Sequence, residues 1–233
     1  MKPTIILAAL VASASAAPKK PVHTLEQYIY HKIRCTRDKD MNYGELSKTS
    51  SGANYILPMS QKEPNKKFQA TEWAQITPND RCAIFNIPLD SKVTAGKRCN
   101  LIFSFAGIAQ MKTTGKYKFE GGGHFQFTGY NFNVSAKEDV TTWNNQPDLA
   151  HEFVNPPPYM KEGNSYMIAQ WRCEPDKDQG PWNMAVTMCS TDSTFSFKQT
   201  NERCPLGFYV VLTDKPVEMN GRRTIGDPEG QEY

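Results

Sequence analysis

The stretch FEGGGHFQFTGYNFNV, residues 119–134, combines three consecutive glycines, a histidine and a series of aromatic side chains. Glycine-rich turns can bind phosphate, but such a loop needs a strand before it and a helix after it, usually with Gly-Lys-Ser/Thr. Here the glycines precede residues that alternate as in a strand, and no lysine follows them. We therefore interpret the stretch as sheet, with the glycines as a connection and a bulge or tight turn at Thr128-Gly129.

Histidines could bind a metal ion, and the chain holds four of them. His124 follows the glycines, and a histidine beside such a turn is typical of a polar surface. His23, His31 and His151 show neither HxH nor HExxH spacing, the usual patterns of zinc ligands. The cysteines include no CxxC pair. We therefore predict no metal site and no cofactor.

Carboxylates could act as general acid and base in sugar hydrolysis, which requires two of them on either side of the scissile bond. We interpret the acidic residues of this chain as surface charge, among them Glu63, Glu72, Glu138, Asp139 and Glu152. The GxSxG turn of serine hydrolases does not occur. The sequence therefore predicts no enzyme. A carbohydrate-active enzyme with an unrecognised carboxylate pair stays open as the alternative.

Tryptophan rings could stack on sugars. Trp171 alternates with Met167, Ala169 and Cys173, which predicts a place in the core. Trp143 lies in TTWNNQP, among amides and outside any apolar period. It is therefore the candidate for stacking on a ligand.

The elements that position these residues are short strands with Pro and Gly between them. The expected strands lie near residue 55 and at 83–87, 100–108, 116–121, 124–134, 164–173, 183–189, 194–199 and 207–213. Long apolar runs of period 3.6 are missing. The pattern predicts an all-β protein, an antiparallel β-sandwich of jelly-roll type. Residues 24–35 could form a short helix or a strand, so we expect a short helical or irregular N-terminal extension.

Residues 1–17 predict the compartment. Lys2 precedes an apolar core of about ten residues, which is too short to span a bilayer, and Ala14-Ser15-Ala16 suits a signal peptidase. We expect a cleaved signal peptide, an extension over 18–52, a sandwich domain over 53–213 and a polar tail over 214–233. This organisation predicts a secreted, extracellular protein without a membrane span. The net charge of +3 is dispersed, which argues against nucleic acid as a partner.

Asn133-Val134-Ser135 is an N-glycosylation sequon. Phe132 and Val134 share one face of the expected strand, so Asn133 lies on the other. If the apolar pair faces the core, the amide points to solvent and can carry a glycan.

Several motifs, in order, resemble the C-terminal domain family named after the ubiquitin-3-binding protein of fungi. They are YILPMSQKEPNKKF, CAIFNIPLDSKVTAGKRCNLIFSF, TTWNNQP, EGNSYMIAQWRCEP and CPLGFYV, and they extend from about residue 53 to 213. The resemblance implies a β-sandwich found in many secreted fungal proteins. The family name derives from an intracellular member that binds part of an activating enzyme for a ubiquitin-like modifier. We do not transfer that partner, because a chain with a signal peptide would not meet a cytosolic enzyme.

The six cysteines all follow the signal peptide, and an even number in an oxidising compartment predicts three disulfides. Cys99 has the parity of Leu101, Phe103 and Phe105, and Cys173 has that of Trp171. These two positions also match the family's cysteines, so we predict a Cys99–Cys173 bond across the core. Cys189 and Cys204 flank a strand and are paired next. Cys35–Cys82 is then the remaining pair.

These observations together predict a secreted, disulfide-stapled β-sandwich that acts as a binding or surface-interaction module. Its ligand would be extracellular, a polysaccharide or a host or cell-surface protein. A role directed at the cell wall or at a host is consistent with the compartment.

Overall fold

A computed structural model describes residues 30–32, 50–108, 117–150, 159–173, 181–200 and 205–215, with the backbone alone for 30–32. Its strands are β1 (Tyr30–Lys32), β2 (Ser51–Gly52), β3 (Tyr55–Ser60), β4 (Trp73–Ile76), β5 (Arg81–Leu89), β6 (Arg98–Phe105), β7 (Tyr117–Gly121), β8 (Phe125–Gly129), β9 (Asn164–Arg172), β10 (Trp182–Ser190), β11 (Ser193–Lys198) and β12 (Leu206–Thr213). The one helix among the described residues, α1 (Ser91–Thr94), is a single turn that Asp90 caps by accepting from the Lys92 N–H.

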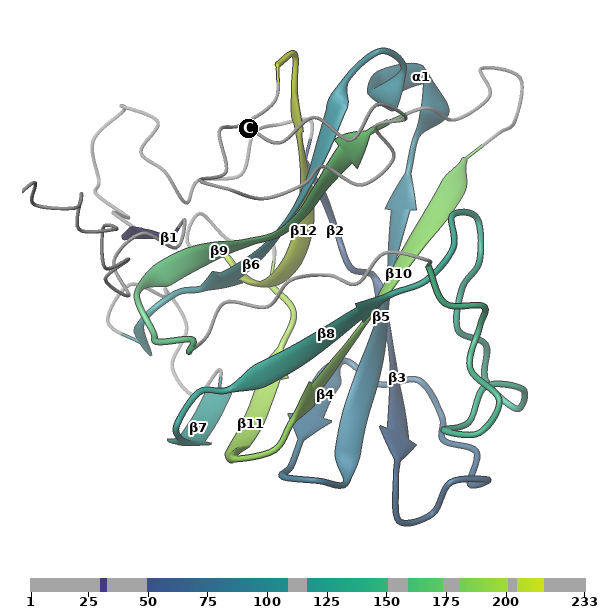
Figure 1. Cartoon of the computed structure of the whole chain (residues 1–233), viewed down its shortest axis with the longest axis vertical. Helices are drawn as coiled ribbons and strands as arrows, with labels where there is room; N and C mark the ends of the chain where they lie inside the picture. Colours follow the sequence, from purple (N-terminus) through teal and green to yellow (C-terminus); the bar gives the residue numbers. More distant parts are fainter. Residues whose placement is uncertain are drawn as a thin grey trace, which may run out of the picture.

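The strands form three antiparallel sheets. A five-stranded sheet has the order β1-β9-β6-β12-β2, a four-stranded sheet β3-β5-β10-β8, and a three-stranded sheet β4-β11-β7. In Figure 1 the five-stranded sheet lies in the upper part, and the four-stranded sheet crosses the lower right. The predicted all-β antiparallel sandwich is confirmed.

Three chain turns join the three-stranded sheet to the four-stranded one at the same end. The turn 77–80 leads from β4 to β5, 122–124 leads from β7 to β8, and 191–192 leads from β10 to β11. The order β4-β11-β7 therefore matches the order β5-β10-β8, and the three turns must lie side by side. We call these turns with their flanking residues, 77–80, 121–124 and 190–193, the corner row.

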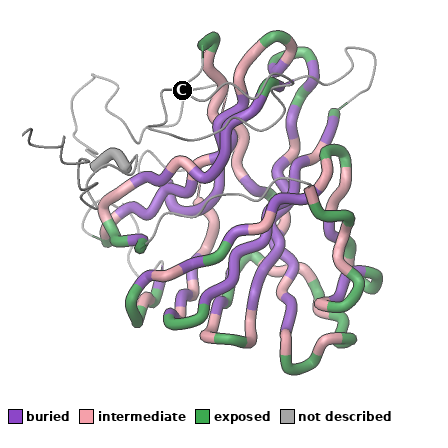
Figure 2. The backbone as a smooth tube through the Cα atoms, viewed as in Figure 1, coloured by how far each residue is buried: buried purple, intermediate pink, exposed green. Residues whose placement is uncertain are grey.

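One apolar cluster fills the space between the sheets and takes residues from all three. Phe103 lies at its centre, with ring centroids 4.9 Å from Phe208 and 5.5 Å from Phe197. Phe85 on the four-stranded sheet lies 4.7 Å from Phe208. Such edge-on and tilted pairs add to the free energy gained by burial. The buried stretches of these strands are coloured purple in Figure 2.

A second apolar cluster covers the other face of the four-stranded sheet. It contains Leu57, Met59, Cys82, Ile84, Tyr130, Ala136, Ala185 and Cys189. Trp143, Val134 and Tyr55 pack against it from the outside. β5 and β10 are consequently buried on both faces, which explains why their sequences read as nearly continuous apolar runs.

Local irregularities depart from the sequence predictions in two places. The strand expected over 124–134 ends at Gly129, and the backbone leaves the regular ladder after it. In β9, a bulge lies opposite Leu101/Ile102, so Tyr166 and Ile168 enter the core and Met167 is only half-buried. A bulge shifts side-chain parity by one residue, so the predicted core position of Met167 is wrong, whereas Trp171 is 1% exposed as expected.

The two described disulfides confirm one predicted pairing and correct two others. Cys99 is bonded to Cys173, with Cα atoms 5.3 Å apart, and both lie in the main cluster. The bond joins β6 to the end of the neighbouring strand β9, so the prediction that it crosses the core from one sheet to the other is wrong. Cys189 is bonded to Cys82, not to Cys204, so the Cys35–Cys82 pairing is wrong as well. β10 and β5 are antiparallel neighbours with Met188 opposite Ala83, which brings the next residue of each strand face to face. The partners are 107 residues apart, a separation that local pattern does not resolve.

Other predictions fall on residues that the structure does not describe. These are the signal peptide at 1–17, most of the extension over 18–52, Cys35, Cys204, His23, His151, Glu152 and most of the tail over 214–233. Within residues 24–35, positions 30–32 form β1 at the edge of the five-stranded sheet, paired with β9. Of the two forms expected there, these residues take the strand.

Candidate functional site

The three glycines of the opening stretch form a turn that passes very close to neighbouring chain. Gly123 has φ +86°, and a Cβ there would lie 2.3 Å from the Met160 carbonyl oxygen. A Cβ on Gly122 would lie 2.4 Å from Oδ2 of Asp192, and one on Gly121 would lie 2.4 Å from the backbone oxygen of Asp192. The interpretation of this stretch as sheet with a glycine connection is therefore confirmed. The physical reason for the glycines is close packing of backbone.

Asp192 is the centre of the corner row. Its Oδ1 accepts hydrogen bonds from the Ser193 hydroxyl at 2.7 Å and the His124 N–H at 3.1 Å, and it lies 3.3 Å from the Ser190 hydroxyl oxygen. The Ser193 hydroxyl, foremost, holds the pKa of this carboxyl below its usual value, and the other donors act in the same direction. Asp192 therefore stays ionised and ties β10, β11 and the glycine turn together.

The turn 77–80 is hydrogen-bonded to the turn between β10 and β11. The Asn79 N–H donates to the Ser190 carbonyl at 2.9 Å, and the Asn79 side-chain amide donates to the Thr191 carbonyl at 3.2 Å. Asp80 accepts from the Ser60 hydroxyl at 2.5 Å, which lowers its pKa. The corner row is thus cross-linked along its length by side-chain hydrogen bonds.

Ser190, Ser193, His124 and Asp192 are the residue types of a catalytic relay, but their geometry differs from one. In a relay the histidine ring bridges the hydroxyl and the carboxylate. Here the His124 ring nitrogen Nδ1 lies 3.3 Å from Thr191 Oγ1, and the Ser190 hydroxyl donates to the His124 carbonyl at 2.7 Å. The cluster consequently stabilises the turns and assembles no nucleophile.

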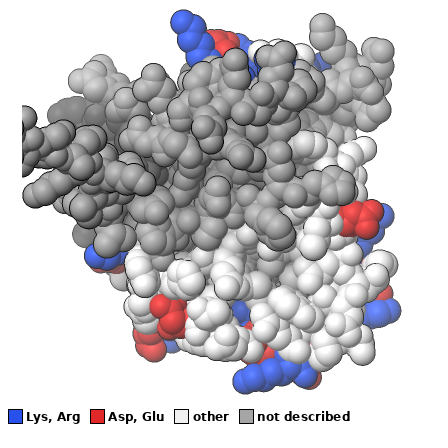
Figure 3. All heavy atoms as spheres, viewed as in Figure 1, with Lys and Arg blue, Asp and Glu red and all other residues white. Residues whose placement is uncertain are grey.

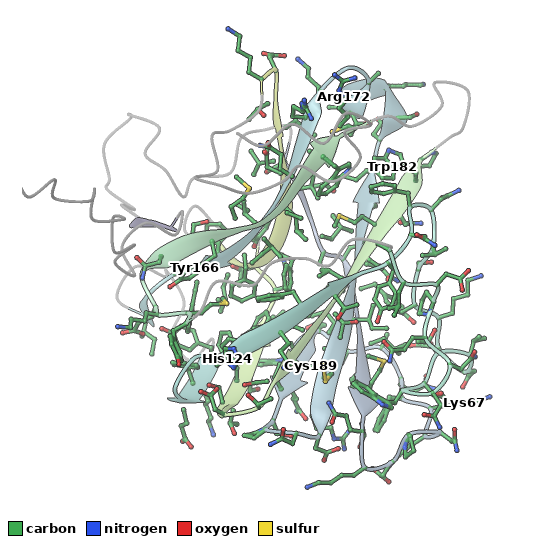
Figure 4. The ribbon with its side chains drawn as sticks, viewed as in Figure 1. Lys67, His124, Tyr166, Arg172, Trp182 and Cys189 are labelled. Carbon is green, nitrogen blue, oxygen red and sulfur yellow. A yellow bond between two sulfur atoms is a disulfide. The ribbon has the colours of Figure 1, made fainter. Side chains whose placement is uncertain are left out.

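His124 is half-buried, and its ring faces the exposed Tyr159, with centroids 5.9 Å apart. In Figure 4 His124 lies on the left side of the molecule and Lys67 on the right. His31 lies on β1, at the edge of the five-stranded sheet, which contributes no strand to the corner row. Among the described residues, no group of three or more His, Cys, Asp or Glu is arranged to hold a metal ion.

Of the four described acidic residues singled out from the sequence, three pair with a lysine or accept a backbone hydrogen bond, and the fourth, Asp139, is exposed. Glu63 pairs with Lys66 at 2.7 Å, and Glu72 pairs with Lys198. Glu138 accepts from the Ala70 N–H at 2.6 Å. The described carboxyl groups with a shifted pKa are Asp80, Asp192 and Asp214, and each shift is downward. A general acid at neutral pH needs the opposite shift.

Trp143 is half-buried and packs against the second cluster. Its segment is folded on itself, since the Asn145 N–H donates to Thr142 Oγ1 at 3.1 Å and the Gln146 amide donates to the Trp143 carbonyl at 2.8 Å. One side of the ring is therefore used in packing. The expectation that Trp143 stacks on a ligand stays a prediction.

The loop that carries Trp143 is fastened to a second loop, over 61–71. The Asn144 N–H donates to the Pro64 carbonyl at 3.0 Å, and the Asn144 side chain donates to Asn65 Oδ1 at 3.0 Å. The Glu138 N–H donates to the Tyr55 hydroxyl at 2.9 Å. We call residues 61–71 and 130–149 together the loop face.

The loop face exposes both apolar and basic side chains. Phe132, Val140 and Leu149 are 48%, 53% and 50% exposed. On the other loop, the Phe68 ring is contacted by Arg81, whose Cζ lies 4.5 Å from the centroid, and by Lys66 at 5.3 Å. In Figure 3 the charged side chains of the described surface stand near its outline, and uncharged atoms fill the middle.

Sequence reasoning did not find the loop face, because the sequence does not show which of its apolar residues are exposed. A partial signal was present, since two of the quoted family motifs, around residues 55–68 and 141–147, lie on or beside it.

A family model described as the ubiquitin 3 binding protein But2 C-terminal domain matches residues 54–203, more than half of the 233 residues. The chain belongs to this family. The match includes both loops of the loop face and the whole corner row, and it ends before β12, short of the residue 213 expected above. Among curated proteins, none matches the chain. Membership of the But2 C-terminal domain family indicates a β-sandwich of binding type.

Proposed function

We propose that this chain is a secreted member of the But2 C-terminal domain family and that it acts outside the cell as a binding module. The predicted signal peptide at 1–17 and the two disulfides support this compartment. Within the described residues, no helix has the length and hydropathy that a bilayer crossing requires. The loop face is the proposed binding surface.

The observation that carries this proposal is the exposure of Val140 and Leu149 on one loop. Contiguous apolar patches are typical of surfaces that another molecule covers, and we take these exposed side chains as parts of one such patch. The hydrogen bonds of Asn144, Asn145 and Gln146 hold this loop in one conformation. A preorganised loop loses little conformational entropy on binding, so contacts with a partner convert more fully into affinity.

The partner is proposed to be a wall polysaccharide or a protein of the cell surface. The two exposed aliphatic side chains suit the apolar face of a sugar or an apolar patch on a protein.

The test is a binding assay on insoluble chitin, β-glucan and host wall polymers, together with capture of surface proteins from intact cells. We expect Val140→Ser with Leu149→Ser to weaken retention about tenfold, since each removes apolar contact. Tyr159→Ser is the matched control, because Tyr159 is 52% exposed but lies near the corner row. Equal loss in both variants would contradict the assignment to the loop face.

The same samples test the enzymatic alternative. Soluble sugars are measured after incubation with each polymer. Release that disappears on substitution of one described carboxylate, with binding unchanged, would favour a carbohydrate-active enzyme. Retention without release supports the module.

A separate measurement tests the compartment. Expression of the full chain in a fungal host should deliver the protein to the medium, with an N-terminus after residue 16 or 17. Protein that stays in the cell with residues 1–17 attached would contradict secretion.

A further inference from the structure

The sequon asparagine lies in an exposed turn after β8. The Tyr130 N–H donates to the Ala185 carbonyl at 3.2 Å, and the Asn133 N–H donates to the Asn183 carbonyl at 2.9 Å. The backbone therefore rejoins β10 at Asn133, with the intervening residues pushed outward. Asn133 has φ +62° and is exposed. Asparagine is among the few residues that adopt this backbone conformation at small cost.

Phe132, the residue before it, is not in the core. Its ring lies over two buried indoles, with centroids 5.8 Å from Trp171 and 5.4 Å from Trp182. Trp171 and Trp182 are 1% and 6% exposed, whereas Phe132 is 48% exposed. The outer side of the aromatic trio thus faces solvent. Of the apolar pair that the sequence placed on one face, Val134 packs against the second cluster and Phe132 stands in solvent, because the strand ends at Gly129 and the turn sets the direction of the ring.

We propose that Asn133 carries an N-linked glycan whose first sugar residues cover the exposed side of Phe132. Consecutive Cα atoms are about 3.8 Å apart, so a sugar joined to the Asn133 amide begins within reach of the neighbouring ring. A pyranose presents an apolar C–H face that can remove aromatic surface from water. This inference rests on the proposed function only in requiring passage through the secretory pathway.

The modification is a glycosyl transfer from a lipid-diphosphate-linked oligosaccharide. A bond forms between Asn133 Nδ2 and the anomeric carbon of the first N-acetylglucosamine. The bond from that carbon to the diphosphate oxygen breaks, the lipid diphosphate leaves, and the amide nitrogen loses one proton. The turn makes the amide accessible to a transferase, and Ser135 completes the acceptor sequence.

Occupancy is tested in a eukaryotic secretory host. Intact mass is measured before and after treatment with an N-glycosidase. We expect a loss equal to one glycan and conversion of Asn133 to aspartate in its peptide. Ser135→Ala should abolish the loss. Ser135→Thr, which keeps the sequon, should preserve it. A wild-type protein with no mass change would overturn the proposal.

To test whether the glycan covers Phe132, the effect of removing the glycan is compared in the wild type, in a Phe132 variant and in a control variant. Removing the glycan from the wild type should raise the binding of an apolar fluorescent dye and lower the Tm by about 2–4 °C, the shift expected for loss of a modest apolar contact in a chain of this size. In Phe132→Ser both effects should fall by at least half. In Leu149→Ser, which changes another exposed apolar residue, they should remain as in the wild type. Equal effects in all three proteins would overturn the coverage.

Two forms of the chain with different secretion leaders distinguish a failure of the glycan site from a failure of the proposed secretion. One form of the chain keeps residues 1–17, and another carries the host's own secretion leader in their place. Glycosylated protein obtained only with the host leader would contradict secretion by the native signal and support the glycan site. Unglycosylated protein in the medium from both forms would overturn the glycan site and leave secretion intact.

Discussion

Gly123 and Asp192 show how single residues hold the corner row together. The Gly123 carbonyl accepts from the Met160 N–H at 2.8 Å, and the Gly123 N–H donates to the Ser193 hydroxyl at 2.7 Å. The contact with Met160 requires a residue without a Cβ, because a Cβ on Gly123 would lie 2.3 Å from the Met160 carbonyl oxygen. The Asp192 carboxylate in turn accepts hydrogen bonds from the Ser193 hydroxyl and the His124 N–H. The residues that first suggested chemistry therefore serve the fold, and the loop face stays the proposed binding surface.

Gly123→Ala should destabilise the protein strongly. The added Cβ meets the Met160 carbonyl, and the positive φ adds a penalty of about 1–2 kcal/mol. Gly96→Ala is the matched control, because Gly96 has φ +72° and an added Cβ there meets nothing within 4 Å. We expect Gly123→Ala to cost at least about 2 kcal/mol more than Gly96→Ala, as overpacking does. Urea denaturation measures both, and equal losses would contradict the close approach.

Asp192→Asn should destabilise the protein in a pH-dependent manner. The folded-state pKa of Asp192 is lowered by the Ser193 hydroxyl and the other donors, so the ionised carboxylate stabilises the fold above its unfolded pKa of about 3.9. This contribution is lost as the pH falls through the lower folded-state pKa. The difference in unfolding free energy between wild type and variant should be constant from about pH 7 to 5 and should shrink below about pH 4. Urea titrations at each pH measure it. A difference that does not change with pH would show that the charge has no part.

At the scale of elements, strand pairing determines which cysteines meet. β5 and β10 are central neighbours, and their antiparallel register puts Cys82 opposite Cys189 next to the corner row. In Figure 4 Cys189 lies low on the four-stranded sheet, where these two strands run together. Cys99 and Cys173 tie β6 to the end of β9 in the opposite sheet. Each described disulfide therefore fastens two neighbouring strands of one sheet.

Non-reducing peptide mapping should find Cys82 linked to Cys189 and Cys99 linked to Cys173. With those four residues used, a peptide joining Cys35 to Cys204 is the expected third product. A Cys189–Cys204 peptide would contradict the register of β5 and β10. Digestion of the reduced protein, in which all linked peptides separate, is the control.

Replacing Cys82 and Cys189 together by alanine should lower the unfolding free energy by about 3–5 kcal/mol. The bond joins cysteines that are 107 residues apart in the sequence. In the chain-entropy model, closing a loop of about 100 residues stabilises the folded state by about 4.7 kcal/mol. Cys99→Ala with Cys173→Ala, which opens a separation of 74 residues, should cost a similar amount. Denaturant titrations compare the two. No loss in either variant would contradict a stapling role.

At the scale of the whole molecule, the three sheets share one core. Phe195 and Phe197 on β11 contact Phe103 on β6, and Phe85 on β5 contacts Phe208 on β12. The five-stranded sheet is thus packed on both others, and the corner row joins the other two to each other. No sheet can separate without exposing the same phenylalanine cluster to water.

Unfolding should therefore be a single cooperative transition. We expect the fluorescence of the four tryptophans, of which Trp171 and Trp182 are buried, to change at the same denaturant concentration as the far-UV circular dichroism. The oxidised protein is used, with its disulfides verified as intact. Two separated transitions would show that one sheet folds as an independent unit.

The sequence by itself determined the features that depend on near neighbours. Alternation of side chains predicted most strands, the core position of Trp171 and the inward direction of Cys99 and Cys173, because i and i+2 share a face in any strand. The glycine turn could also be distinguished from a phosphate loop, since strand-type residues follow it. The order of motifs was sufficient to indicate the family.

Only the tertiary structure decided which distant segments meet. The pairing of Cys82 with Cys189, the alignment of three turns in the corner row and the packing of Trp143 on a second cluster depend on how strands far apart in the chain are ordered in the sheets. The exposure of Phe132 depends on where β8 ends. The free energies that select these arrangements come from packing across the whole core and from the hydrogen bonds of all the strand pairs together. A local pattern, which records only the preferences of adjacent residues, does not contain them.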